Sequence, residues 1–137
     1  MRRAIFALPL ALVLAAACAP TPGPAVDTTQ VHVSVSYRER IMLPPGHVVS
    51  VRVEDVSRAD APAVVVGEAS MTTGERGPPY ELTVDVPTNR IDPRLEYAVR
   101  AEIREPGGAL RFTTDTRHSV LTRGAPDRAE IMLVAAR

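Results

Sequence analysis

The sequence lacks tryptophan and lysine, and it has a single cysteine among its 137 residues. One cysteine cannot form an intramolecular disulfide, so a disulfide-stabilised fold is excluded. Three tyrosines and two phenylalanines leave few rings that could stack on sugars or bases. The 16 basic residues, all arginine, are balanced by 16 acidic residues. A strongly basic surface for nucleic acid is therefore not expected.

Patterns that carry catalytic chemistry are also missing. His32, His47 and His118 lack the HxH or HExxH spacing of zinc sites. No GxSxG stretch is present, and no glycine-rich loop opens a helix as a phosphate site requires. Glu54 and Asp55 are neighbours that would face opposite sides of a strand, so they cannot flank one bond. We predict that the protein is not an enzyme and uses no metal or other cofactor.

What the sequence does contain begins with an N-terminal leader. Arg2 and Arg3 precede an apolar run from Ala4 to Leu14, and three alanines then lead to Cys18. The apolar run is too short to span a bilayer as a helix, and the order of charged, apolar and small residues is typical of a secretory signal. Residues 1–17 are therefore predicted to be a signal peptide.

The stretch LVLAAACAP resembles a bacterial lipobox, with Ala15 where leucine is usual. The resemblance implies that Cys18 is the lipid-attachment site and becomes the acylated first residue of the mature chain. Three acyl chains would form a firm membrane anchor. The alternative is a plain signal peptide with a spare cysteine. The same resemblance implies that an aspartate directly after the cysteine would favour retention in the inner membrane. Because this position is Ala19, we expect the periplasmic face of the outer membrane.

The segment after the cysteine differs in composition from the rest of the chain. Residues 18–30 contain three prolines and almost no large apolar side chains, which predicts a flexible, lipidated tether. Without Arg2 and Arg3 the mature chain has 14 arginines and 16 acidic residues, a formal charge of −2. Residues 31–137 are predicted to form one domain large enough to fold without disulfides.

Apolar and polar residues alternate through most of this domain, as in VHVSVSY. The alternation predicts strands at 31–37, 48–56, 63–71, 80–86, 95–104, 109–116 and 129–134, with a possible bulge at Gly67. We therefore predict an all-β fold, a single antiparallel β-sandwich of about seven strands, immunoglobulin- or transthyretin-like. An open barrel is the alternative topology.

Two segments leave local alternatives. Strict alternation would place Glu39 on the apolar face between Tyr37 and Ile41. Either a bulge turns the charges around Glu39 outward, or Glu39 points inward and pairs with an arginine. The short polar side chains in residues 55–60 are predicted to build a turn, and a ligand-contacting loop is the other reading.

Three blocks, residues 33–63, 90–103 and 110–124, resemble the YbaY family of lipoproteins, which is grouped with the YscW-type pilotins of type III secretion. The most specific pieces are YRERxxLPPG, EDVSRADAP and FTTDTxxxVLTRG. His118-Ser119 stands where the family pattern has Tyr-Pro. The resemblance implies a small β-sandwich on an outer-membrane lipid anchor. Pilotins carry secretin subunits to the outer membrane, whereas YbaY-like members have no settled activity.

We therefore predict a pilotin-like binding or assembly factor, anchored by lipid at the periplasmic face of the outer membrane, that binds no nucleic acid. Its partner would be a peptide segment of an envelope or secretion protein, bound at a sheet edge or as a helix in a groove. The alternative is an envelope module that binds carbohydrate or glycolipid, or that is purely structural. Tyr37, Tyr80, Tyr97 and Phe112 lie on the predicted core face, which weakens the sugar-binding alternative.

Overall fold

The computed structural model describes residues 23–137, and their regular structure is almost entirely strand. The strands are β1 (Thr28–Tyr37), β2 (Val48–Asp55), β3 (Val64–Thr72), β4 (Tyr80–Pro87), β5 (Tyr97–Arg104), β6 (Leu110–Thr113), β7 (His118–Val120) and β8 (Arg128–Ala135). Within the described range the only helical element is the 3-10 turn η1 (Thr88–Arg90). The all-β prediction is confirmed. β1 begins three residues earlier than predicted, inside the segment assigned to the tether.

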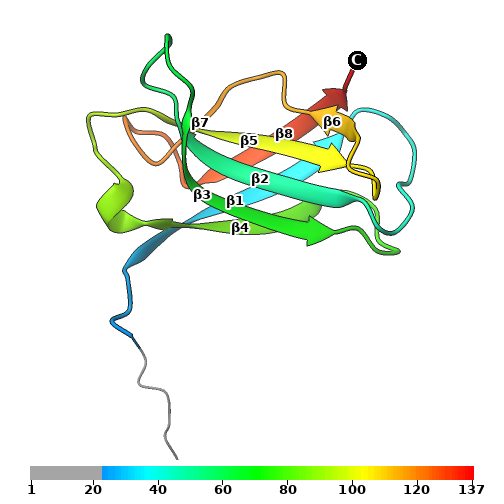
Figure 1. The fold of residues 1–137 in the computed structure, drawn as a ribbon, viewed down its shortest axis with the longest axis horizontal. Helices are drawn as coiled ribbons and strands as arrows, with labels where there is room; N and C mark the ends of the chain where they lie inside the picture. The colour runs from blue at the N-terminus through cyan, green and yellow to red at the C-terminus, as the bar shows by residue number, and fades with distance from the viewer. Residues whose placement is uncertain (1–22) are drawn as a thin grey trace, which may run out of the picture.

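The strands form one hydrogen-bonded path, β3-β2-β5-β6-β8-β1-β4, with β7 beside β5. The path curls into a nearly closed, barrel-like sheet (Figure 1). Two separate sheets of an immunoglobulin- or transthyretin-like sandwich are therefore not confirmed. The purely antiparallel order was wrong at one place, because β1 and β8 are parallel. A parallel pair needs a long crossover, and these are the first and last strands, so the whole intervening chain provides it.

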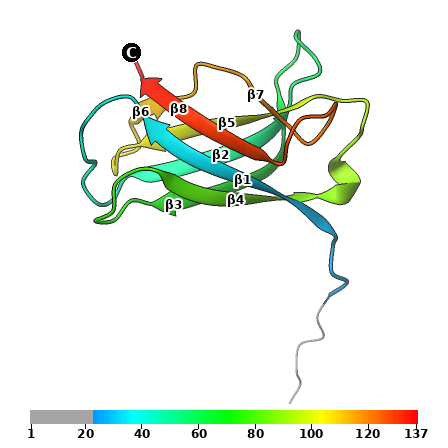
Figure 2. The same ribbon diagram turned by 180° about the vertical axis from the view of Figure 1, so that it is seen from behind.

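β3 and β4, the two ends of the path, lie side by side in Figures 1 and 2 and close the barrel without a backbone ladder between them in the described residues. Their close approach is at Gly67, where an added Cβ would lie 3.0 Å from the carbonyl oxygen of Asp85 and 3.0 Å from the side chains of Val84 and Val86. The β2–β3 register shifts beside it, leaving Val66 as the extra residue. The bulge predicted at Gly67 is confirmed at this neighbouring position.

The strand predicted at residues 109–116 is shorter than expected, and a strand that was not predicted, β7, follows it at His118–Val120. β6 ends at Thr113 because the next side chain replaces the ladder. The Thr114 hydroxyl accepts a hydrogen bond from the backbone N–H of Ala101 (2.7 Å) and donates one to its carbonyl oxygen (2.8 Å). The chain then leaves the sheet and returns as β7, where His118 pairs with Val99.

The core is formed by the apolar face of each strand, as the alternation predicted. Its buried members include Val31, Val33, Val35, Val49, Val51, Val53, Val84, Val86, Val99, Ile103, Ile131 and Leu133, with the aromatic residues Tyr37, Tyr80, Tyr97 and Phe112. Burial of each large apolar side chain contributes about 1.5–3 kcal/mol. The predicted core placement of the four aromatic residues is confirmed, and none of these rings is free to stack on a sugar.

The barrel has two ends with different structures. We call the end where β1 begins the N-terminal end and the end where β1 finishes the far end (Figures 1 and 2). At the N-terminal end the Tyr97 hydroxyl donates to the carbonyl oxygen of Arg90 (3.0 Å) and accepts from the N–H of Asp92 (2.9 Å). The Thr122 hydroxyl donates to the carbonyl oxygen of Leu95 (2.7 Å). These bonds join the loops of that end to the core.

Candidate functional site

An apolar hollow lies at the far end, between the β1–β2 loop and the β5–β6 turn. Its volume is about 430 Å³, within the range of ligand pockets. It is lined by Ile41, Met42, Leu43, Pro44, Pro45, His47, Glu105, Pro106 and Arg111. Ile41 and Met42 are 41% and 64% exposed, although both are large apolar side chains. Exposed apolar side chains gathered around a hollow are typical of a binding surface.

The hollow is formed by the YRERIMLPPG block, which leaves the sheet earlier than predicted. β1 ends at Tyr37, whose hydroxyl donates to the carbonyl oxygen of Ile41 (2.8 Å) and fixes the loop against the core. The expected bulge around Glu39 was therefore wrong, and so was the inward-pointing alternative, because Glu39 is exposed in the loop. The turn that follows needs Gly46, whose φ of 101° favours glycine and whose backbone packs close to Pro106.

Polar groups around the hollow are largely paired. The carbonyl oxygen of Pro44 accepts from the Thr73 hydroxyl and from Nδ1 of His47, each at 3.0 Å. The same Thr73 oxygen accepts from the backbone N–H of His47 (3.0 Å). At the rim Arg111 pairs with Glu105 at 3.2 Å. The walls are therefore held by hydrogen bonds, and the open surface between them is mainly hydrocarbon.

Aromatic rings fill the barrel at the same end. The rings of Tyr37 and Phe112 stack with centroids 4.8 Å apart and planes 12° apart. Burial, and secondly the nearby Tyr37, raises the pKa of Tyr80 to about 12. The Tyr80 hydroxyl is buried, and no atom of the described residues lies in hydrogen-bonding geometry to it. Tyr80 therefore stays neutral at ordinary pH, and this end of the core carries no charge.

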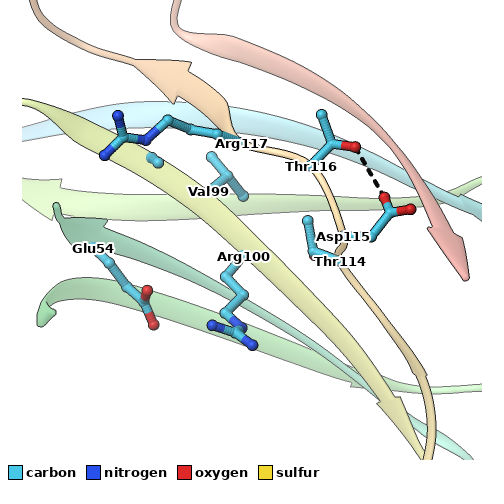
Figure 3. A pocket seen from close by; sticks show the side chains of 8 residues that line it. Glu54, Val99, Arg100, Thr114, Asp115, Thr116 and Arg117 are labelled. Atoms are coloured by element: carbon cyan, nitrogen blue, oxygen red, sulfur yellow. Dashed lines mark hydrogen bonds between the residues drawn. The ribbon is translucent and has the colours of Figure 1, made fainter. Parts of the chain in front are cut away.

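A second, polar hollow of about 220 Å³ lies on the side of the barrel, where Glu54, Arg100 and the segment 114–117 meet (Figure 3). Its Thr116 hydroxyl donates to Asp115 (2.9 Å). Arg117 extends away from Arg100 in Figure 3 and pairs with Glu96 at 3.6 Å. Because the charges diverge and are of both signs, this hollow offers no concentrated charge to a ligand.

The residues 55–60 build a turn, as predicted. The Asp55 carboxylate accepts from the backbone N–H (2.9 Å) and the hydroxyl (2.6 Å) of Ser57. The Ser57 oxygen in turn accepts from the N–H of Glu96 (2.8 Å), which joins this turn to the start of β5. Asp55 and Ser57 are therefore engaged in holding this turn in place.

The three histidines lie apart from one another. His32 faces Thr83 across β1 and β4, with Nδ1 3.2 Å from the hydroxyl; His47 lines the apolar hollow; and His118 is in β7. Between Gly23 and Arg137 no group of three His, Cys, Asp or Glu side chains is placed to hold a metal ion. In that same range no helix is long and apolar enough to cross a membrane. Cys18, the predicted lipid-attachment site, lies outside the described residues.

The sequence reasoning missed the hollow. The sequence did contain a sign of it, the apolar run IML directly before the turn residues PPG. The apolar residues beside this turn lie after a strand and not within it. Reading Ile41 as a continuation of the β1 core face obscured it. The contribution of Pro106, about 60 residues later, becomes visible only once β1 and β5 finish at the same end.

The fold and the hollow place the chain in the class of small all-β domains that carry an exposed apolar hollow at one end. A family model described as "Type III secretion system lipoprotein chaperone (YscW)" matches residues 26–133, which is most of the chain. The chain belongs to this family, as its three sequence blocks predicted. The matched residues include every segment that lines the apolar hollow.

Two individual proteins support this assignment. The chain is 30% identical over 114 residues to the "uncharacterized lipoprotein YbaY" of Escherichia coli K12, covering 83% of this chain and 59% of the relative. It therefore spans about three-fifths of the length of that protein. A solved structure, an "alternative pilotin from the type II secretion system of Vibrio cholerae", is 38% identical with a TM-score of 0.77. That match covers 81% of this chain and 99% of the pilotin.

Proposed function

We propose that this protein is a pilotin-like, non-enzymatic chaperone, anchored by lipid in the periplasmic leaflet of the outer membrane, that binds an apolar segment of a secretin-type secretion component. The observation that carries the proposal is the apolar hollow at the far end, in a chain of the secretion lipoprotein chaperone family. The relation to a type II secretion pilotin supports the same role.

The hollow suits an amphipathic segment better than a polar ligand. Removal of apolar surface from water is favourable by about 25 cal/mol per Å², so a partner that covers Ile41 and Met42 gains affinity without needing many polar contacts. A helix that inserts apolar side chains into a groove is the recognition mode that fits such a surface. The backbone around the hollow is fixed by the hydrogen bonds to Pro44, so little ordering is needed on binding.

The position of the hollow suits a lipid-anchored carrier. The chain enters the barrel at the N-terminal end (Figure 1). The β1–β2 loop and the β5–β6 turn, which line the hollow, are at the opposite end. A lipid attached at Cys18 would join the barrel to the bilayer through the end opposite the hollow, so the anchor would leave the hollow uncovered. A partner bound there would be kept at the membrane without contacting the anchor.

The anchor is tested directly at Cys18. The Cys18→Ser chain should move from the membrane to the soluble fraction of the envelope, because its one acylation site is lost. Mass spectrometry of the wild-type chain should find a mature N-terminus at Cys18 carrying acyl groups. A free thiol at Cys18, or a mature terminus elsewhere, would contradict the anchor.

The chaperone role is tested by charging the hollow. We expect the acylated wild-type protein to recover a secretin subunit from its own envelope, and the Ile41→Asp and Met42→Asp variants to lose it. Met132→Asp is the matched control, because Met132 is also exposed (49%) but lies on β8 outside the hollow. Equal recovery by the hollow variants and the control would overturn the proposed binding site, and absence of any secretin would overturn the partner.

A further inference from the structure

His47 lines the apolar hollow and has a polar side chain that the proposed binding of an apolar segment does not require. Only 7% of the residue is exposed, yet it lines the apolar hollow. A buried polar group normally has its hydrogen bonds satisfied, because an unpaired one costs free energy. At the rim, the charges of Glu105 and Arg111 are already paired with each other at 3.2 Å. His47 therefore stands out among the hollow's side chains.

The hydrogen bond to Pro44 decides which nitrogen of the neutral imidazole carries the proton. A carbonyl oxygen can only accept, so the 3.0 Å contact from Nδ1 to the Pro44 oxygen requires the proton on Nδ1. In the neutral ring the other nitrogen, Nε2, is then a lone-pair acceptor. No donor from residues 23–137 reaches Nε2. The buried side-chain atoms without a partner do not include Nε2, so this atom keeps some accessible surface. It is thus an open acceptor on a ring that is otherwise buried.

We propose that Nε2 of His47 is the hydrogen-bond acceptor of the apolar hollow, so that the hollow selects an apolar side chain that also carries one N–H or O–H donor. This inference rests on the proposed function of the hollow as the partner site and specifies what the partner presents there. A single neutral hydrogen bond of this kind changes binding about three- to tenfold. The hydrocarbon walls would give affinity, and His47 would decide between side chains of similar shape.

The test compares two probes of nearly equal shape, indole, which has an N–H donor, and indene, which has none. Their binding to the isotope-labelled chain from residue 18, carrying Cys18→Ser so that no lipid absorbs the probes, is followed by NMR. Indole should bind the hollow about three- to tenfold more tightly than its hydrophobicity relative to indene predicts, and should shift the Nε2 resonance of His47. An unshifted Nε2 resonance on saturation with indole would overturn the proposal.

Two variants separate the two nitrogens. In His47→Asn the amide N–H replaces Nδ1 toward Pro44, and no acceptor remains at Nε2. The ratio of indole to indene affinity should fall about three- to tenfold from its wild-type value. In His47→Gln an amide group reaches the Nε2 position, and its oxygen should restore part of the ratio. An unchanged ratio in His47→Asn would also overturn the proposal.

The outcome is independent of the partner's identity. If indole is selected through His47 but no secretin is recovered from the envelope, the inference stands and the proposed partner is wrong. If the secretin is recovered through the hollow but the probe ratio is the same with and without Nε2, the proposed function stands and this inference is wrong.

Discussion

At both ends of the barrel hydroxyl groups bind loop backbone atoms, but the two ends differ in where they place the apolar side chains of their loops. At the N-terminal end, hydroxyl groups of Tyr97 and Thr122 bind loop backbone atoms, and Ile91, Leu95 and Leu121 pack against the core. At the far end, Ile41 and Met42 are exposed around a hollow. The apolar loop side chains are thus packed against the core at the N-terminal end and remain available at the far end, where a partner is proposed to bind.

The largest expected effect concerns the seam that closes the barrel beside the N-terminal end. Gly67→Val should destabilise the fold by about 3 kcal/mol, because even a Cβ would lie 3.0 Å from a backbone oxygen of β4 and two core side chains. Gly74→Val, in the loop at the far end, is the control, since nothing lies within 4 Å of its added Cβ. Urea unfolding measures both. Equal stabilities would contradict the close packing of β3 on β4.

A smaller difference is expected between one tyrosine of each end. Tyr97→Phe leaves the N–H of Asp92 and the carbonyl oxygen of Arg90 without their partner, which should cost about 2 kcal/mol. Tyr80→Phe removes a buried hydroxyl that has no partner, so the free energy of unfolding should stay the same or rise. Thermal or urea unfolding measures the stability of both variants. A larger loss of stability in Tyr80→Phe than in Tyr97→Phe would contradict this expectation.

This comparison also shows what the sequence could reveal. Alternation along β1, β2 and β4 predicted the buried valines, because side chains on a strand point to opposite faces regardless of which strand is next to it. The parallel pairing of β1 with β8 was not predictable in the same way, since it depends on contacts between the two ends of the chain. The break at Thr114 was hidden because a threonine hydroxyl can replace ladder hydrogen bonds without disturbing the apolar pattern.

The candidate site was less accessible to sequence reasoning than the fold. Ile41 and Met42 are apolar, and an apolar residue beside a strand is normally assigned to the core. Their exposure follows from where β1 stops, and the loop beyond it is held by the bond from the Tyr37 hydroxyl to the Ile41 carbonyl oxygen. The open nitrogen of His47 depends on the loop bringing Pro44 within 3.0 Å of the ring. A spacing pattern contains neither of these facts.

The far end should tolerate polar substitution in stability while losing function. Met42→Ser should change the free energy of unfolding by less than about 0.5 kcal/mol, because the side chain is 64% exposed. The same change should weaken binding of both indole and indene, since it removes hydrocarbon from the hollow wall. Met132→Ser, on β8, is the control for probe binding. A stability loss as large as that of Tyr97→Phe would mean that Met42 belongs to the core.

The smallest effect concerns the pKa values of two groups, a surface carboxylate at the N-terminal end and a buried tyrosine at the far end. Hydrogen bonds from Arg94 lower the pKa of Asp92 to about 2, whereas burial raises the pKa of Tyr80 to about 12. For a carboxyl whose pKa is lowered on folding, the contribution to stability is present above its ordinary pKa of about 3.9 and is lost as the pH falls through about 2.

Because Asp92 is at the surface, this contribution is screened by solvent, and the titration itself is the sensitive measurement. NMR titration of the Asp92 carboxyl should give a midpoint near pH 2 in the wild-type chain, and Arg94→Gln should raise the midpoint toward the ordinary value. Arg90→Gln keeps the three hydrogen bonds between Asp92 and Arg94, the shortest of which is 2.7 Å, and should leave the midpoint in place. If Arg90→Gln moved the midpoint as far as Arg94→Gln, the general positive charge of the loop would be the cause instead of the two hydrogen bonds from the Arg94 guanidinium.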